Sequence, residues 1–188
     1  AREGVSAYPS SVTAQMVKNF LQGGAAINVL ARQIGAQVRV VDMGVQEDMG
    51  APPGLWVRKI GLGTRNMCEG PAMSREQAVQ SVEEGIRLVQ EAYADGIRLI
   101  GIGEMGIGNT TASSAITAVM TRHSVADVTG KGTGVDALQL AKKIQVIERG
   151  IQRNTPDAHD PLDVLEKIGG FEIGGLVGIL VGGAACRV

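Results

Sequence analysis

Residues 97–111 of the chain read IRLIGIGEMGIGNTT, an apolar run that ends in a turn with four glycines and one carboxylate, Glu104. Residues 112–120, which follow at once, have the composition of a helix. Strand, glycine turn and helix in this order form anion sites in α/β proteins, because glycines let the backbone approach a ligand and the N–H groups at the helix start face a phosphate. A carboxylate aimed at that phosphate would repel it, so we expect Glu104 to face a sugar hydroxyl or a nitrogen that must lose a proton. The turn therefore predicts a phosphorylated substrate, with acid–base or polar chemistry close by.

The composition excludes several classes of partner. The chain has 188 residues, of which 44% are hydrophobic and 20% charged, as in ordinary globular proteins. A formal net charge of -1 leaves no broad basic surface for nucleic acid or anionic lipid, and an aromatic content of 3% argues against base-stacking platforms.

The 27 glycines are about twice the usual share. We interpret the clusters at 101–108 and 130–134 as ligand loops, and this interpretation is weaker for the glycines at 174–183, where close helix packing is the alternative.

Cysteine usage and hydropathy predict the compartment. Cys68 and Cys186 lie far apart and form neither a metal-ligand spacing nor a disulfide framework, so we expect a cytoplasmic protein without a metal or cofactor. His123 and His159 have no metal-like partner nearby in the sequence and are expected at the surface. The apolar segment 173–185 is shorter than the roughly 20 residues that a bilayer span requires, and it predicts a buried helix instead.

Hydrophobic periodicity and capping signals predict alternating strands and helices. Strands are expected at 37–42, 55–60 and 97–102. Helices are expected at 11–34 with a break at Gly23-Gly24, at 74–94, at 112–120, at 136–153, from Asp160-Pro161 to 169, and at 173–185. This order is typical of βαβ units. The chain is therefore predicted to have an α/β fold with a mainly parallel sheet and helices on both faces, a Rossmann-like three-layer architecture, with residues 1–188 forming a single domain.

Two familiar nucleotide motifs match only in part. Residues 101–106 fit the G-x-G-x-x-G pattern of dinucleotide sites, but 122–126 do not read as the buried strand that should precede an acidic residue at 127. A nicotinamide-dependent oxidoreductase is thus a weak alternative. Gly130-Lys131 lacks the earlier glycine and the following hydroxyl residue of a P-loop. That loop could still hold a phosphate through its backbone, with Lys131 or Lys143 adding charge.

Several segments together resemble a known family. Residues 3–9 with 12–14, 41–45, 71–77, 101–111, 130–134 and 160–171 are similar, in the same order, to segments of the nicotinate-nucleotide–dimethylbenzimidazole phosphoribosyltransferases of the cobalamin pathway. The resemblance implies transfer of a phosphoribosyl group from nicotinate mononucleotide to 5,6-dimethylbenzimidazole or a related base, which gives α-ribazole 5′-phosphate and nicotinate. It also implies small-molecule substrates, no nucleic-acid or membrane partner, and a homodimer.

The resemblance assigns site residues by position in this sequence. Glu104 matches the carboxylate at the ribose and base that supports catalysis, and Lys143 matches a phosphate-binding lysine. Further substrate contacts match in the glycine turn, in the second glycine loop and near the first helix: Gly103, Met105, Gly106, Asn109, Thr110, Gly132, Thr133, Tyr8 and Met16. Met105 matches an apolar residue against the base. By their apolar character alone, Tyr8 and Met16 would be core residues.

The chain departs from the family in two respects. Tyr8 and Met16 stand where known members have a small serine and a glutamine, which predicts a bulkier and less polar base slot and leaves the accepted base open. Family members also extend beyond both ends of the matched region, and the glutamate usually assigned as general base follows position 188. We therefore expect residues 1–188 to bind nicotinate mononucleotide weakly and to turn over little. The rival hypothesis is a non-catalytic mononucleotide-binding fragment or subunit that needs a second chain.

Overall fold

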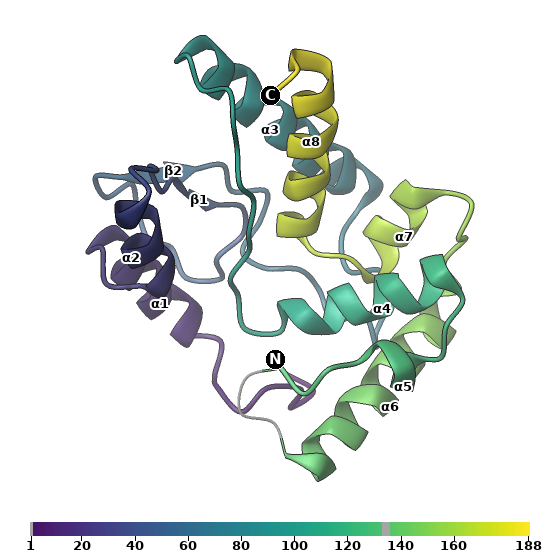
Figure 1. The fold of residues 1–188 in the computed structure, drawn as a ribbon. Helices are drawn as coiled ribbons and strands as arrows, with labels where there is room; N and C mark the ends of the chain where they lie inside the picture. The colour runs from purple at the N-terminus through teal and green to yellow at the C-terminus, as the bar shows by residue number, and fades with distance from the viewer. Residues whose placement is uncertain (1, 133–135) are drawn as a thin grey trace.

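The computed structural model describes residues 2–132 and 136–188 and has an α/β fold with a parallel sheet. Figure 1 shows the order of its elements along the chain. The elements are α1 (Val12–Leu21), α2 (Ala26–Gln33), β1 (Val40–Asp42), β2 (Leu55–Val57), α3 (Arg75–Ala94), α4 (Asn109–Thr121), α5 (Val125–Val128), α6 (Ala137–Asn154), α7 (Pro161–Ile168) and α8 (Phe171–Cys186). The expected break between the first two helices is confirmed, since α1 ends before Gly23-Gly24 and α2 begins after them.

The sheet is formed by β1 and β2, which pair in parallel with Val41 opposite Trp56. Both strands are shorter than the sequence predicts, because only three residues of each meet across the ladder. Asp42 ends β1 with a buried carboxylate that accepts a hydrogen bond from the Val45 amide at 2.8 Å and pairs with Lys59 at 3.1 Å. This pairing compensates the charge that the fold buries at the strand end.

The strand expected at 97–102 is not formed. These residues run through the molecule as a chain without helix or ladder, visible in Figure 1 between the end of α3 and the start of α4. A strand needs a neighbour to accept its backbone hydrogen bonds, and in the parts of the chain that the structure describes, the ladder joins only β1 and β2. Leu99 is accordingly 89% exposed. The prediction of this strand was wrong for the described structure, although the α/β class is confirmed.

Helices α3 and α8 lie side by side along their length (Figure 1). A Cβ built on Gly85 would lie 2.8 Å from the Cα of Gly178, so the two backbones meet where only glycine fits. The glycines of α8 therefore serve helix packing. The opposite face of α8 is exposed at Val177, Leu180 and Val181, which corrects the expectation of a buried helix. Among the described residues, none of the helices combines the length and hydropathy needed to cross a bilayer.

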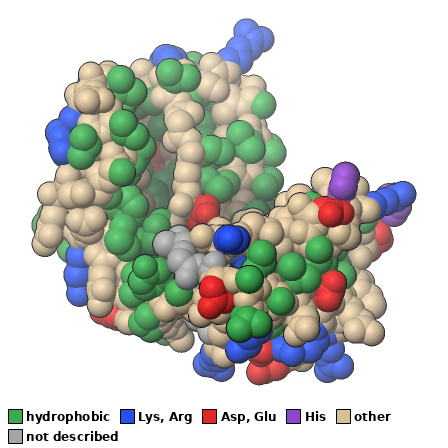
Figure 2. Space-filling view, turned by 60° about the horizontal axis from the view of Figure 1, so that its bottom comes forward, with side chains coloured by type: hydrophobic (Ala, Val, Ile, Leu, Met, Phe, Trp, Pro, Cys, Tyr) green, Lys and Arg blue, Asp and Glu red, His purple; other side chains and the backbone are tan. Residues whose placement is uncertain are grey.

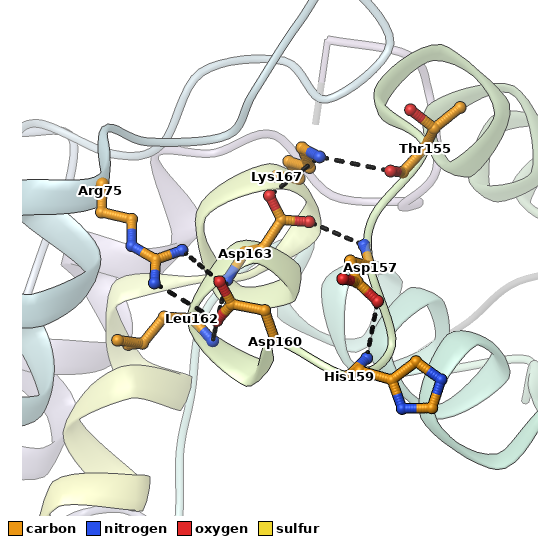
Figure 3. A network of polar contacts seen from close by, with 8 residues as sticks. All are labelled: Arg75, Thr155, Asp157, His159, Asp160, Leu162, Asp163 and Lys167. Carbon is orange, nitrogen blue, oxygen red and sulfur yellow. Dashed lines mark hydrogen bonds and ion pairs between the residues drawn. The ribbon is translucent and has the colours of Figure 1, made fainter.

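A polar network joins the starts of α3 and α7 (Figure 3). Asp160 caps α7 by accepting hydrogen bonds from the amides of Leu162 at 3.0 Å and Asp163 at 3.2 Å, as the Asp-Pro signal predicts. The same carboxylate pairs with Arg75 at 2.7 Å, and this guanidinium lowers the pKa of Asp160. The network fixes α7 against α3, and α7 also contributes to the core that α4 and α6 share: Ala115, Ile147, Val164 and Ile168.

Candidate functional site

The glycine turn is held in place from both sides. Gly108, the N-cap of α4, has φ 97°, a left-handed conformation that favours glycine. The Ile107 amide donates to Thr13 Oγ1 of α1 at 3.0 Å, which ties the turn to the first helix. The side chain of Asn109 folds over Gly106, where a Cβ would lie 2.6 Å from Asn109 Oδ1. The turn thus has a defined shape at the start of α4.

Glu104 lies in this turn and is oriented by the helix that follows. Its Oε2 accepts a hydrogen bond from Asn109 Nδ2, at the first residue of α4. The residue is exposed, so its carboxylate can reach a bound molecule. The role that the sequence predicts, a carboxylate beside the anion site and not inside it, fits this geometry.

Beside the turn lies a large cavity, of about 2030 Å³. Its lining includes five of the predicted residues of the turn, together with Met16 of α1: Gly103, Glu104, Met105, Gly106 and Asn109. Figure 2 shows this hollow, with hydrophobic side chains on its walls. Small-molecule sites usually measure ~300–1,000 Å³, so the cavity has room for a nucleotide and a second, flat molecule.

A buried ammonium group forms a candidate anion centre next to the cavity. Lys143 is 1% exposed, and its Nζ donates to Thr110 Oγ1 at 2.9 Å and to the Gly130 carbonyl at 3.4 Å. Within the described residues no carboxylate pairs with it. Burial lowers the pKa of Lys143, because the charged form loses its hydration. A bound anion would supply the missing counter-charge.

Gly132 completes this centre. It has φ +64°, and a Cβ there would lie 3.5 Å from Thr110 Oγ1 and 3.6 Å from Lys143 Nζ. The structure therefore brings together Thr110, Gly132 and Lys143, from α4, the second glycine loop and α6. They do not line the cavity, but Thr110 directly follows Asn109, which does. The positive end of α4 and the ammonium group thus adjoin the glycine turn.

Comparison with known proteins gives the family. A phosphoribosyltransferase family model, DBI_PRT, matches residues 1–188. The chain belongs to this phosphoribosyltransferase family. A relative from Roseiflexus sp. (strain RS-1), named nicotinate-nucleotide–dimethylbenzimidazole phosphoribosyltransferase, is 59% identical over 188 residues, which are 100% of this chain and 53% of the relative. A protein of the same name from Geobacter sulfurreducens is 58% identical over 186 residues, which are 99% of this chain and 53% of the relative.

Solved structures of the family agree with the fold. The crystal structure of CobT from Thermus thermophilus matches with a TM-score of 0.92 and 41% identity, over 100% of this chain and 56% of the other. A second structure from that organism, of a nicotinate-nucleotide–dimethylbenzimidazole phosphoribosyltransferase, matches with a TM-score of 0.91 and 40% identity, over 100% and 55%. The chain spans about half the length of the curated relatives that it matches.

The structure separates two residues that the family resemblance places together at the base slot. Met16 lines the cavity, whereas Tyr8 is 45% exposed in the segment before α1 and does not belong to the lining. The expectation of a core position for Tyr8 is therefore wrong, and its place at the base slot stays a prediction. Thr133 lies outside the described residues.

Sequence reasoning missed Glu172, in the first turn of α8. It lines the same cavity as Glu104, and its Oε1 is buried without a hydrogen-bond partner in the described structure. Burial is the main reason that the pKa of Glu172 rises to about 7, and the nearby charge of Glu104 raises it further. A signal was present in the sequence, because Glu172 is the one charged residue between Lys167 and Arg187.

Proposed function

We propose that residues 1–188 form a single phosphoribosyltransferase domain that binds nicotinate mononucleotide and takes part in transferring its phosphoribosyl group to 5,6-dimethylbenzimidazole or a related base. The products are α-ribazole 5′-phosphate and nicotinate, in the synthesis of the lower ligand of cobalamin. The observation that carries the proposal is the junction of a buried cation, Lys143, which no carboxylate pairs among the described residues, with the start of α4, whose first residue, Asn109, orients the carboxylate of Glu104.

The 5′-phosphate is assigned to the anion centre. Lys143 supplies a full positive charge, Thr110 a hydroxyl, and the N-terminus of α4 the positive end of its helix dipole. Gly132 leaves the backbone of the second loop open on the same side. With the phosphate bound there, the ribose extends past Asn109 toward Glu104 and the cavity.

The chemistry then takes place at the anomeric carbon. A ring nitrogen of the incoming base forms a bond to C1′ from the face opposite nicotinate, and the bond between C1′ and the nicotinate nitrogen breaks. The electron pair of that bond neutralises the cationic ring of nicotinate, so the leaving group departs without a charge on its ring nitrogen. The N–H proton of the base must pass to an acceptor, which the family places C-terminal to the matched region, and Glu104 supports the step electrostatically from the ribose side.

The flat base is assigned to the apolar part of the cavity, near Met16 and Met105. Tyr8 lies outside the lining, so it does not narrow this slot in the described structure. We also propose, from the family resemblance, that the protein works in the cytoplasm as a homodimer.

The alternative function is a non-catalytic mononucleotide-binding unit that needs a second chain. An assay with nicotinate mononucleotide and dimethylbenzimidazole, followed by chromatography, separates the two. Nicotinate release that depends on the added base supports the transferase, and binding without turnover supports the alternative. Failure of the protein to bind nicotinate mononucleotide would contradict both.

A further inference from the structure

We propose that Glu172 is a second carboxyl group of this site, positioned to contact the cationic ring of the bound mononucleotide beside Glu104. The inference rests on the proposed function and assigns to α8 a direct contact with substrate.

The backbone at Gly170 allows the side chain of Glu172 to reach the cavity wall. This side chain folds back over Gly170, where a Cβ would lie 2.7 Å from the carboxyl carbon, so the glycine makes this conformation possible. The carboxyl group thereby lies at the cavity wall. A buried carboxyl oxygen without a hydrogen-bond partner is costly in a folded protein. Such a cost is common where a group is kept for a ligand.

The surroundings of Glu172 contribute negative charge. Among the described residues, Glu104 of the glycine turn is the charged group that acts on it, and neither α3 nor α7 brings a cation to it. Two carboxyl groups therefore line the same cavity, and among the described residues no cation offsets the charge of Glu172. Burial chiefly, and the charge of Glu104 in addition, raise the pKa of Glu172 to about 7, so about half of this carboxyl group is protonated at neutral pH.

The two ends of the site attract opposite charges. Lys143 and the start of α4 attract an anion, while Glu104 and Glu172 attract a cation or an N–H donor. Nicotinate mononucleotide has the matching polarity, with a phosphate at C5′ and a positively charged ring nitrogen at C1′. A positive charge near Glu172 lowers its pKa, so binding should drive the proton off the carboxyl group.

Proton release on binding tests the inference. Titration calorimetry at pH 7 in buffers of different ionisation enthalpy counts the protons released when nicotinate mononucleotide binds. We expect about half a proton from Glu172 in the wild-type protein, none from this group in Glu172→Gln, and weaker binding by that variant. Glu148→Gln, an exposed carboxylate on α6 outside the cavity lining, is the matched control and should behave as wild type. Ribose 5-phosphate, which lacks the ring, should release the same number of protons from wild type and Glu172→Gln.

A second measurement does not depend on a variant at position 172. In protein labelled with carbon-13 at glutamate carboxyl groups, saturation with nicotinate mononucleotide should lower the titration midpoint of Glu172 by about one pH unit or more. An unmoved midpoint, or equal proton release by wild type and Glu172→Gln, would overturn the inference and leave the proposed function standing. If the wild-type protein does not bind the mononucleotide, the proposed function fails and the inference fails with it.

Discussion

Lys143 Nζ donates a 2.9 Å hydrogen bond to Thr110 Oγ1, although the two residues are 33 positions apart. The contact joins the interior of α6 to the first turn of α4, so a charge from one helix is placed at the positive end of another. Thr110 is neutral, so it cannot compensate the charge of the ammonium group. Burial of this charge therefore costs folding free energy and favours binding of an anion, as expected of a site that is kept for a ligand.

Removing that charge should separate binding from stability. In Lys143→Met the stem keeps its packing while the ammonium group is lost, and one charge-assisted contact to phosphate is worth about 1.5–3 kcal/mol. We expect the Kd for nicotinate mononucleotide, measured by calorimetry, to rise about 10- to 100-fold. The denaturant midpoint of the ligand-free protein should stay the same or increase, because a desolvated cation is removed.

The adjacent Lys142 provides the control, since it is exposed on the same helix. Lys142→Met should leave the Kd within about twofold of wild type. Equal losses of affinity in the two variants would indicate a general effect of net charge and would remove Lys143 from the phosphate site.

The raised pKa of Glu172 should make the free energy of unfolding depend on pH. This pKa is about 7 in the folded protein and near 4.5 when unfolded, so between these values the unfolded chain loses the proton first. The free energy of unfolding therefore falls as pH rises through this window, by about 2–3 kcal/mol between pH 5 and 8. Urea unfolding at the two pH values measures it, and Glu172→Gln should abolish that part of the fall.

Other shifted carboxyl groups act outside this window. The pKa values of Glu3, Glu76, Asp160 and Asp163 are lowered, so their contribution to stability is present above the ordinary carboxyl range and is lost only as pH falls below it. The comparison of pH 5 with pH 8 thus reports on Glu172. If wild type and Glu172→Gln lose the same stability over this range, the carboxyl group is not desolvated as described.

Local signals in the sequence predicted the helix starts well. Ser74 with Gln77 forms the capping box of α3, and Asp160 caps α7 ahead of a proline. These contacts lie within three residues of each other, so the sequence contains both partners. The strand expected at 97–102 failed for the opposite reason, because a strand exists only where another chain segment pairs with it.

The sequence predicted those parts of the candidate site that depend on local contacts, and it missed those that depend on tertiary packing. Glu104 and Asn109 belong to one turn, and their hydrogen bond follows from the local sequence. The burial of Lys143 depends on how α6 packs against the rest of the fold, and spacing alone favours a solvated lysine. Glu172 was missed because its place on the cavity wall is decided by the contact of α8 with α3. The assignments of site residues remain predictions until a ligand is bound.

The close contact of α3 with α8 should not tolerate a side chain. A Cβ on Gly178 would lie 2.9 Å from the Cα of Gly85 and would also clash with the Val82 carbonyl. Backbone atoms cannot move aside as side chains do, so we expect Gly178→Ala to lower the free energy of unfolding by about 3 kcal/mol. Chemical denaturation measures this loss. Gly70→Ala, whose Cβ would meet nothing within 4 Å, is the control and should change stability by less than about 0.5 kcal/mol. A similar loss in both variants would show that the helix contact is not the cause.

Glu104 should matter for catalysis and little for folding. Its carboxylate is exposed and, among the described residues, accepts one hydrogen bond, from Asn109. Glu104→Gln keeps the size of the side chain and removes the charge beside the ribose, so kcat/KM for nicotinate mononucleotide and dimethylbenzimidazole should fall about 10²- to 10⁴-fold in protein that shows turnover. Product analysis by chromatography gives the rate, and the thermal midpoint should shift by less than about 2 °C. Glu148→Gln should retain full activity. If Glu104→Gln retains the wild-type kcat/KM, the carboxylate has no part in the reaction.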